Sequence, residues 1–490
     1  MERSGSPSTF NEPFLSVLHR SPHQGSHLYG CSFPPKRVSL HFQPFGNLSH
    51  PAGALYVLAQ DLRKAFLLDF PGQRHAFRIR GFEVTAGLAL REFAEGIKGR
   101  PPLSRLSMVC LIGYLFSAPF SISISQIFVF TGIASWLVSL RLEGGPSGFQ
   151  LPLWRPIALL VALTLISAAF SDDPGRSLKD AKQLFQVLIF YFALNTVLSE
   201  REALWLVKAL LSAAAVASVF TLGVAFMQPV GLANRMSGFF SIYMTLGGYL
   251  VIAGAMAVSY FITSEGSVSK GLAGAASIVI IAALMSTFSR NAWIGFGAAA
   301  LCAALVARSI KGIVLIASLT ALVLIFSPAS IRDRLFSIGD MKDPSTRERV
   351  FMWKSGMEMV RDRPLLGTGL DMIKRTYSRY ANPEAMKKRT GHLHNNPLHI
   401  AAERGIPGFV AWMWFMGAFF VAGVRRLKGY GEAGFERRYL SVAGLSAITG
   451  FFIAGLFEYN YGDSEVVMLA YFVMSLPFMG ARETESTEGG

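Results

Sequence analysis

Runs of about twenty mostly apolar residues recur between residues 104 and 480, separated by short polar stretches. Each run is long enough to cross the roughly 30 Å hydrocarbon core of a bilayer as an α-helix. Only a polar kink at Ser117–Ser125 separates the first two runs. The pattern predicts an all-α, polytopic helical membrane protein with about twelve transmembrane helices. The expected spans lie near residues 106–122, 124–141, 155–171, 180–198, 203–226, 241–262, 271–288, 292–308, 311–327, 407–425, 438–457 and 463–480.

The spacing of these spans divides the chain into five parts. Residues 1–103 are basic, rich in Pro, Ser and Gly, and carry no long apolar run, so we expect a disordered cytoplasmic extension. Residues 104–327 hold the first nine spans, and residues 407–480 hold the last three. A polar segment of about eighty residues, 328–406, separates the ninth span from the tenth, with an expected amphipathic helix. Residues 481–490 form a short acidic tail.

Lysine and arginine in the short loops predict the orientation of the chain, because cytoplasmic loops carry the excess of these residues. With the N-terminus inside, the cytoplasmic side receives a dense basic group between the tenth and eleventh spans (Arg425, Arg426, Lys428, Arg437 and Arg438). Both termini are then cytoplasmic. The 328–406 segment faces the opposite side, the periplasm or cell exterior.

The composition excludes several other classes of protein. Hydrophobic residues make up 52% of the chain and charged residues 16%, which is not typical of a soluble globular protein. The net charge of +15 suits anionic membrane lipids and anionic substrates. There is no aromatic-interleaved basic patch, so no nucleic-acid partner is expected, and the three scattered cysteines indicate no metal cluster. Because no nucleotide-binding motif is present, any donor should arrive already activated.

Candidate chemistry gathers in one window. After residue 103 the only histidines are His392, His394 and His399, just before the tenth span. Histidine exchanges protons near neutral pH, so the window predicts acid–base chemistry there. Arg235 and Arg290 lie in apolar surroundings at the same expected membrane face, where arginine is costly and usually functional. A planar guanidinium suits phosphate and pyrophosphate.

An ordered set of short motifs resembles the O-antigen ligase and polymerase superfamily. The motifs are Thr287-Phe288-Ser289-Arg290, Arg347 with Trp353, Pro364-Leu365-Leu366-Gly367-Thr368-Gly369, His392-Leu393-His394-Asn395 and Glu403-Arg404-Gly405-Ile406-Pro407-Gly408. The likeness covers roughly residues 105–480 and departs from the family pattern in the N-terminal extension. It implies a fold similar to the type C membrane glycosyltransferases, with one large periplasmic loop between helices 9 and 10. It also implies a multi-pass protein of the bacterial inner membrane whose active site faces the periplasm.

The resemblance implies a metal-independent, inverting glycosyltransferase without cofactors. The donor would be an undecaprenyl pyrophosphate-linked glycan, and the acceptor lipid A–core for a ligase or another lipid-linked glycan for a polymerase. The family's essential arginines correspond to Arg235 and Arg290, and its motif histidine to His394, the expected general base.

Further residues are expected to bind substrate or support the base. Asn395 would orient the base, Arg347 would add a contact to the pyrophosphate, and Glu403 would orient a histidine or cap the tenth span. His392 remains an alternative base.

Other interpretations remain open at this stage. An exopolysaccharide polymerase fits as well as a ligase, and a transporter of the same lipid-linked glycan would also have many spans and basic residues. The pair Asp172 and Asp173 suggests a turn before a helix more than a metal site. Glu458, Asn460 and Asp463, between the last two spans, could reach the histidine pocket.

Overall fold

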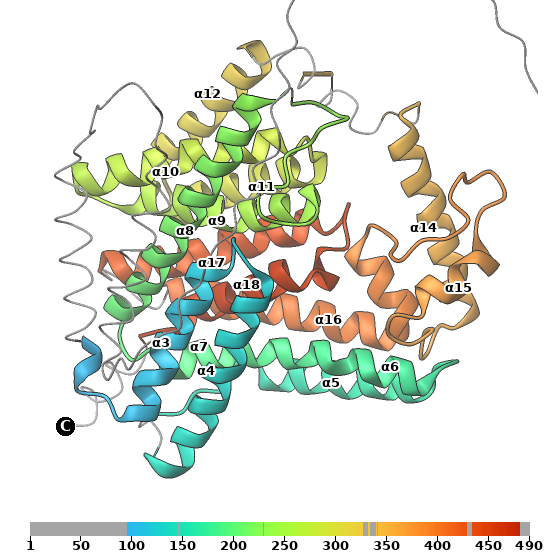
Figure 1. Cartoon of the computed structure of the whole chain (residues 1–490), viewed down its shortest axis with the longest axis horizontal. Helices are drawn as coiled ribbons and strands as arrows, with labels where there is room; N and C mark the ends of the chain where they lie inside the picture. The colour runs from blue at the N-terminus through green and yellow to red at the C-terminus, as the bar shows by residue number, and fades with distance from the viewer. Residues whose placement is uncertain are drawn as a thin grey trace, which may run out of the picture. The chain divides into compact units, whose positions relative to one another are not determined.

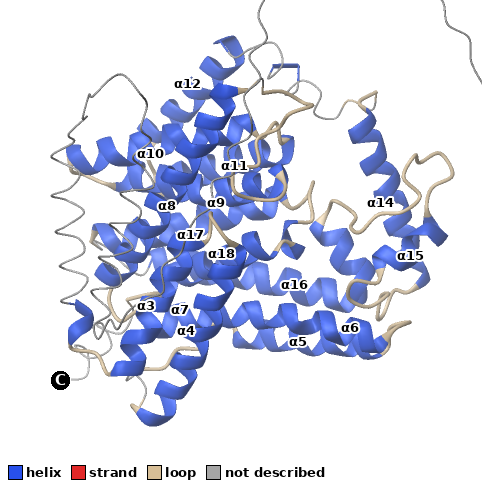
Figure 2. Ribbon diagram, in the orientation of Figure 1, coloured by secondary structure: helices blue, strands red, loops and turns tan. Residues whose placement is uncertain are grey.

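The computed structural model describes residues 96–480, apart from 145–147, 229, 327–331, 334–339, 341 and 429–433. Helices and connecting loops account for all of this described part, which contains no strand (Figure 2). The predicted fold class is confirmed, and the protein is a polytopic helical membrane protein. The expected N-terminal extension lies outside the described residues up to residue 95, and so does the acidic tail.

The helices follow the expected spans closely. They are α3 (Pro102–Ser117), α4 (Ile122–Leu142), α5 (Trp154–Ala169), α6 (Pro174–Asp180), α7 (Leu188–Thr196), α8 (Glu200–Met227), α9 (Tyr243–Thr263), α10 (Ser267–Ser286), α11 (Arg290–Val306), α12 (Ile310–Phe326), α14 (Pro344–Asp362), α15 (Ile373–Tyr380), α16 (Asn396–Lys428), α17 (Phe435–Ala454) and α18 (Ser464–Ser475). Short 3₁₀ segments η1 (Ala181–Val187), η2 (Asn460–Gly462) and η3 (Leu476–Phe478) join some of them.

Five described helices, α4, α8, α9, α10 and α16, are long and apolar enough to span a membrane. Four shorter apolar helices accompany them: α3, α5, α11 and α18 with its 3₁₀ extension. The expected kink at Ser117–Ser125 is a tight turn, because α3 ends at Ser117 and the Ser121 side chain accepts a hydrogen bond from Ile124 N at the start of α4. The two helices pack against each other as a hairpin.

Helices α9, α11 and α17 pack against one another at the centre of the described part (Figure 1). In α9, 78% of the most apolar stretch is buried inside the protein. Gly295 of α11 lies against the backbone of Gly450 in α17, where a β-carbon would come within 2.7 Å of the Gly450 carbonyl oxygen. Small residues of this kind let membrane helices approach closely, and van der Waals contact then holds them together.

The fourth expected span, 180–198, is not one continuous α-helix. Its first half is η1 and its second half is the nine-residue α7. A 3₁₀ helix has three residues per turn, so Gln183 and Gln186 fall on one face. Both line an internal pocket together with Arg404 of α16. Both glutamine side chains therefore lie at the wall of this pocket.

The 328–406 segment contains α14, α15 and the first turns of α16. Helices α14 and α15 lie together near the N-terminal end of α16 (Figure 1). Helix α16 continues into the tenth span but breaks at Gly405, whose φ of 71° and ψ of 176° are not helical. This break coincides with the expected start of the span at residue 407, where Pro407 is well placed to begin a helix.

Two glycine-containing motifs fix that break by backbone contact. Thr368 N and Gly369 N donate to the carbonyl oxygens of Ala402 and Glu403 at 2.9 Å, and Ile406 N donates to Pro364 O at 2.7 Å. A β-carbon on Gly405 would come within 2.3 Å of the Leu365 carbonyl oxygen in the facing segment. The segments 364–369 and 402–406 can therefore meet only because glycines stand at the points of contact.

Candidate functional site

The histidine loop is held on both sides by the helices around it. Leu393, between His392 and His394, is fully buried. Its carbonyl oxygen accepts a hydrogen bond from Trp353 Nε1 of α14 at 3.1 Å. Its backbone N–H donates to His399 Nδ1 of α16 at 3.3 Å. Both imidazoles that flank Leu393 are therefore presented from a fixed backbone.

His394 adopts a left-handed backbone conformation, with φ of 49°. This region is uncommon for residues other than glycine, and such strain concentrates at functional sites. Asn395 follows and its Oδ1 accepts the Leu398 N–H at 2.8 Å, which caps the start of α16. The cap fixes the backbone directly after His394.

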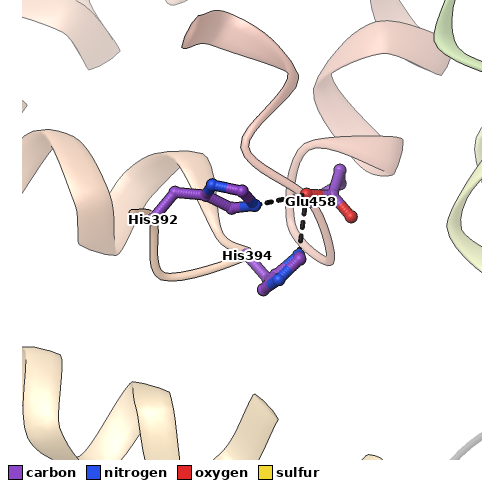
Figure 3. A group of neighbouring side chains, drawn as sticks. All are labelled: His392, His394 and Glu458. Atoms are coloured by element: carbon purple, nitrogen blue, oxygen red, sulfur yellow. Dashed lines mark hydrogen bonds and ion pairs between the residues drawn. The ribbon is translucent and has the colours of Figure 1, made fainter. Parts of the chain in front are cut away.

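His392 and His394 both point at the carboxylate of Glu458, in the loop between α17 and α18 (Figure 3). His394 Nδ1 lies 2.7 Å from Glu458 Oε1, and His392 Nε2 lies 3.6 Å from the same oxygen. The Glu458 side chain is 8% exposed, the His394 side chain 14% and the His392 side chain 41%. Glu458 therefore supports His394 directly and His392 more distantly.

Two neighbouring asparagines hold the Glu458 loop in place. Asn395 Nδ2 donates to Leu456 O at 2.8 Å. Asn396, which is fully buried, donates its backbone N–H to Gly455 O at 2.7 Å and its Nδ2 to Asn460 Oδ1 at 2.6 Å. The 455–460 loop is thus pinned to the start of α16 on either side of Glu458. The distance between Glu458 and His394 depends on these contacts.

Arg349 of α14 joins the other oxygen of Glu458, with Nη2 3.4 Å from Oε2. Arg290, the first residue of α11 and 7% exposed, pairs with Asp343 at 3.0 Å. Asp343 also caps α14, because it accepts the Thr346 N–H at 2.9 Å. The beginnings of α11 and α14 are thus joined, and Arg290 lies close enough to Arg349 for their charges to interact.

Arg235 belongs to the same group of charges. It lies in the loop between α8 and α9, which is tied to the end of α10 by the hydrogen bond from Met236 N to Ser286 O at 3.2 Å. Its guanidinium carbon lies 4.5 Å from the centre of the Tyr243 ring. Burial lowers the pKa of Arg349, Glu458 opposes that change, and the positive charges of Arg290 and Arg235 add to the lowering. The structure therefore brings Arg235, Arg290 and Arg349 into electrostatic range of one another, and we call them the arginine group.

The charge states of the acid–base residues follow from their surroundings. Burial alone would raise the pKa of Glu458, but the hydrogen bond and charge of His394, together with Arg349, lower it below its ordinary value. Glu458 is therefore an anion at neutral pH. Burial and the neighbouring His394 lower the pKa of His392 to about 4, so His392 is neutral.

Two of the predicted site residues lie elsewhere. Arg347 is exposed on α14, roughly 200° around the helix from Arg349. Glu403 is buried, 3.2 Å from His399 Nε2, and accepts the Asp371 N–H at 2.9 Å. His399 in turn stacks on Tyr459, the neighbour of Glu458, with 3.4 Å between ring centres. Glu403 thus reaches the site only through His399 and Tyr459.

Sequence reasoning missed Arg349, although a signal was present. Polar residues recur at helical spacing along α14, at positions 347, 354, 358 and 361, and all four are exposed. That periodicity assigns Arg347 to the solvent face and Arg349 to the flank of the buried face. The triplet Arg347-Glu348-Arg349 alone did not show which of the two arginines lies toward the buried face of the helix.

Among the described residues, one group has a donor set that a metal ion could use. His392, His394 and Glu458 each offer one ligand atom, and these atoms lie within 4.8 Å of one another. The arginine group next to Glu458 disfavours a second cation there. Asp172 and Asp173 bind arginines of the 328–406 segment, with Arg363 at 2.8 Å from Asp172 and Arg375 at 3.0 Å from Asp173. These two carboxylates bind the end of α14 and the helix α15 to the α5–α6 turn.

Comparison with known protein families finds one match to this chain. Residues 275–413 match the family described as O-Antigen ligase. The matched range includes Arg290, Arg349, both loop histidines and the glycine motifs of the α16 break. Over this segment the chain is similar to the O-antigen ligase family. A search of curated proteins found no match.

The match to the O-antigen ligase family suggests a glycosyltransferase-type membrane enzyme of the ligase or polymerase kind. Two residues of the site, Arg235 and Glu458, lie outside the matched range. The fold nevertheless places both beside residues within it.

Proposed function

We propose that the chain transfers a glycan from an undecaprenyl pyrophosphate donor to the hydroxyl of a second glycolipid, with inversion at the anomeric carbon. The observation that carries this proposal is the His394–Glu458 pair next to the arginine group. Such a pair suits a general base, and such a group suits a pyrophosphate leaving group. The favoured acceptor is lipid A–core, which would make the enzyme an O-antigen ligase.

The tautomer of His394 follows from its contact with Glu458. An anionic carboxylate at 2.7 Å accepts a hydrogen bond, so Nδ1 carries the proton and Nε2 keeps its lone pair. Nε2 would take the proton from the acceptor hydroxyl as the oxygen attacks the anomeric carbon. Glu458 would then stabilise the imidazolium that forms.

The arginine group would act on the other partner of the reaction. When the bond between the anomeric carbon and the phosphate oxygen breaks, its electron pair leaves with the pyrophosphate. Three guanidinium groups fixed before the reaction can stabilise that charge without reorganising. Because pyrophosphate is a good leaving group, the proposal needs no general acid and no metal ion. His392, neutral and half-exposed, would contact the acceptor.

The proposal includes the cellular setting. The enzyme would lie in the bacterial inner membrane with both termini in the cytoplasm. The 328–406 segment and the site would face the periplasm, where lipid-linked glycans are joined.

The test is a transfer assay with purified enzyme and one undecaprenyl pyrophosphate glycan, with and without lipid A–core. Product that forms only with lipid A–core supports a ligase, and longer lipid-linked chains without it support a polymerase. His394→Ala and Arg290→Ala should each lower the rate at least 100-fold, which corresponds to about 2.7 kcal/mol. Arg347→Ala, on the exposed face of α14, is the matched control and should retain activity.

Two outcomes would reject the proposal. One is full transfer activity in both variants while they are inserted normally in the membrane. The other is loss of activity with a chelator that added divalent ions restore, because that result would reject metal independence.

A further inference from the structure

A short basic segment, Lys387-Lys388-Arg389, stands directly before the histidine loop. All three residues are exposed, and so is Met386 before them, at 65%. One acidic residue, Glu384, precedes the segment. The mechanism described above does not use these charges.

This segment is not a loosely attached loop. The buried carboxylate of Glu348 accepts the backbone N–H groups of Met386 at 2.9 Å and Lys387 at 3.1 Å. Lys388 Nζ donates to the carbonyl oxygens of Asn382 and Pro383 at 3.0 and 2.7 Å. The backbone is therefore fixed to α14, one residue from Arg349, while the side chains of Lys387 and Arg389 extend into solvent.

The basic segment also lies close to the acid–base residues. The positive charge of Lys387 contributes to the lowered pKa of His392. Thr390 Oγ1 donates to His392 O at 2.9 Å and so links the segment to the histidine loop. The pKa of Arg349, in contrast, is lowered by the positive charges of Arg290 and Arg235. Positive charge thus approaches the Glu458–His394 pair both from the arginine group and from the side of His392.

The two groups of cations differ in their surroundings. In the arginine group, Arg290 and Arg349 are largely buried and Arg235 is half-buried, and the proposed function assigns the group to the donor pyrophosphate. Lys387 and Arg389 are exposed, so they favour an anion that stays hydrated and binds by charge more than by shape. A donor held by the arginine group leaves the His392 side of the base for the acceptor.

On these grounds we propose that Lys387 and Arg389 form an acceptor subsite that recognises an anionic group, a phosphate, on the acceptor glycan. The inference rests on the proposed function, because it needs His394 as the base between donor and acceptor. It adds the chemical class of the acceptor, a negatively charged glycolipid.

The test compares the wild type with the double variant Lys387→Glu/Arg389→Glu in neutral phosphatidylcholine nanodiscs. The substrates are one lipid-linked donor and the acceptor glycolipid, used either phosphorylated or after phosphatase treatment. Lys354→Glu/Lys374→Glu is the matched control, because it reverses the charge of two exposed lysines on α14 and α15. Binding of each acceptor without donor is measured alongside transfer.

The double variant should raise KM for the phosphorylated acceptor about tenfold at low salt, with kcat and the donor KM nearly unchanged. Tenfold corresponds to about 1.4 kcal/mol, of the size expected for reversing two exposed charges. The effect should shrink as salt is added and should be absent for the dephosphorylated acceptor and for the control variant.

Other results would overturn the inference. An equal rise in KM for both acceptors would show that Lys387 and Arg389 do not recognise the anionic group. An effect that appears only when anionic lipids are added to the nanodiscs, whatever the acceptor, would assign the segment to the membrane surface. Absence of transfer by the wild type with every acceptor would reject the proposed function instead, while the binding measurements would still decide the subsite.

Discussion

Substitution of Glu458 by glutamine is the sharpest test of the acid–base pair. The change keeps the size of the side chain but removes its charge, and both Glu458 partners are affected, His394 at 2.7 Å and Arg349 at 3.4 Å. A hydrogen bond to a charged group contributes about 1.5–3 kcal/mol. If that contribution is realised only when His394 becomes protonated in the transition state, kcat should fall roughly 10- to 150-fold.

The assay is transfer with both substrates saturating, after membrane insertion and thermal stability have been verified. The donor KM should change less than kcat, because the arginine group keeps its remaining contacts. Asp463→Asn is a matched control on the same α17–α18 loop. Burial raises the pKa of Asp463 to about 7, so its carboxyl group is partly protonated at neutral pH and the amide changes less charge.

The reasoning fails if Glu458→Gln retains more than half of the wild-type kcat. It also fails if Asp463→Asn loses as much activity as Glu458→Gln. Either result would mean that His394 does not rely on the carboxylate that contacts it, and the base would have to be sought at His392.

Three further predictions follow from single contacts. Gly405→Ala should destabilise the protein by several kcal/mol, because the added β-carbon meets backbone atoms and the residue has positive φ, whereas Gly417→Ala in the same helix meets open space and should leave the melting temperature unchanged or higher. Arg349→Gln should raise the donor KM and lower kcat, and unchanged values would remove Arg349 from the arginine group. The pKa of His392 is lowered from 6.5 to about 4, so the unfolded chain binds more protons in that window and stability falls as the pH drops from 6.5 to 4. His392→Gln should show a smaller fall in melting temperature over this range, and an equal fall in both proteins would contradict the assignment; solvent screening of the half-exposed ring will reduce the size of the effect.

Much of the fold could be predicted because a membrane imposes a simple rule on sequence. Each crossing needs about twenty apolar residues in a helix, and that pattern is visible in one sequence. The rule failed at 180–198, where Gln183 and Gln186 line an internal pocket and the helix is 3₁₀. Local hydrophobicity does not contain this information, because the pocket also includes Arg404, more than two hundred residues away in sequence.

The site could be predicted only where its residues are close in sequence. The histidine window identified His394 and His392, and the resemblance identified Arg290 and Arg235, but the contact with Glu458 joins residues 64 positions apart. Glu458 was noted only as a residue that could reach the pocket. The contact is set by the packing of α16 against the α17–α18 loop, and apolar periodicity does not specify such packing.

The two glycine motifs and the two asparagines hold the backbone of the site, and they are distinct from the residues proposed to react. Segments 364–369 and 402–406 bind each other through backbone atoms, and Asn396 binds the Glu458 loop, so these groups bond to the protein itself. They fix the base and its carboxylate to within hydrogen-bond distance, which catalysis by prearranged groups requires. The basic segment Lys387-Lys388-Arg389 is attached to the same support through Glu348 but remains exposed. If support, base and leaving-group site serve any acceptor, then the choice between ligase and polymerase chemistry must rest on exposed residues such as these. Exchanging the exposed residues of the 381–392 loop between family members should therefore change the acceptor while leaving donor use intact.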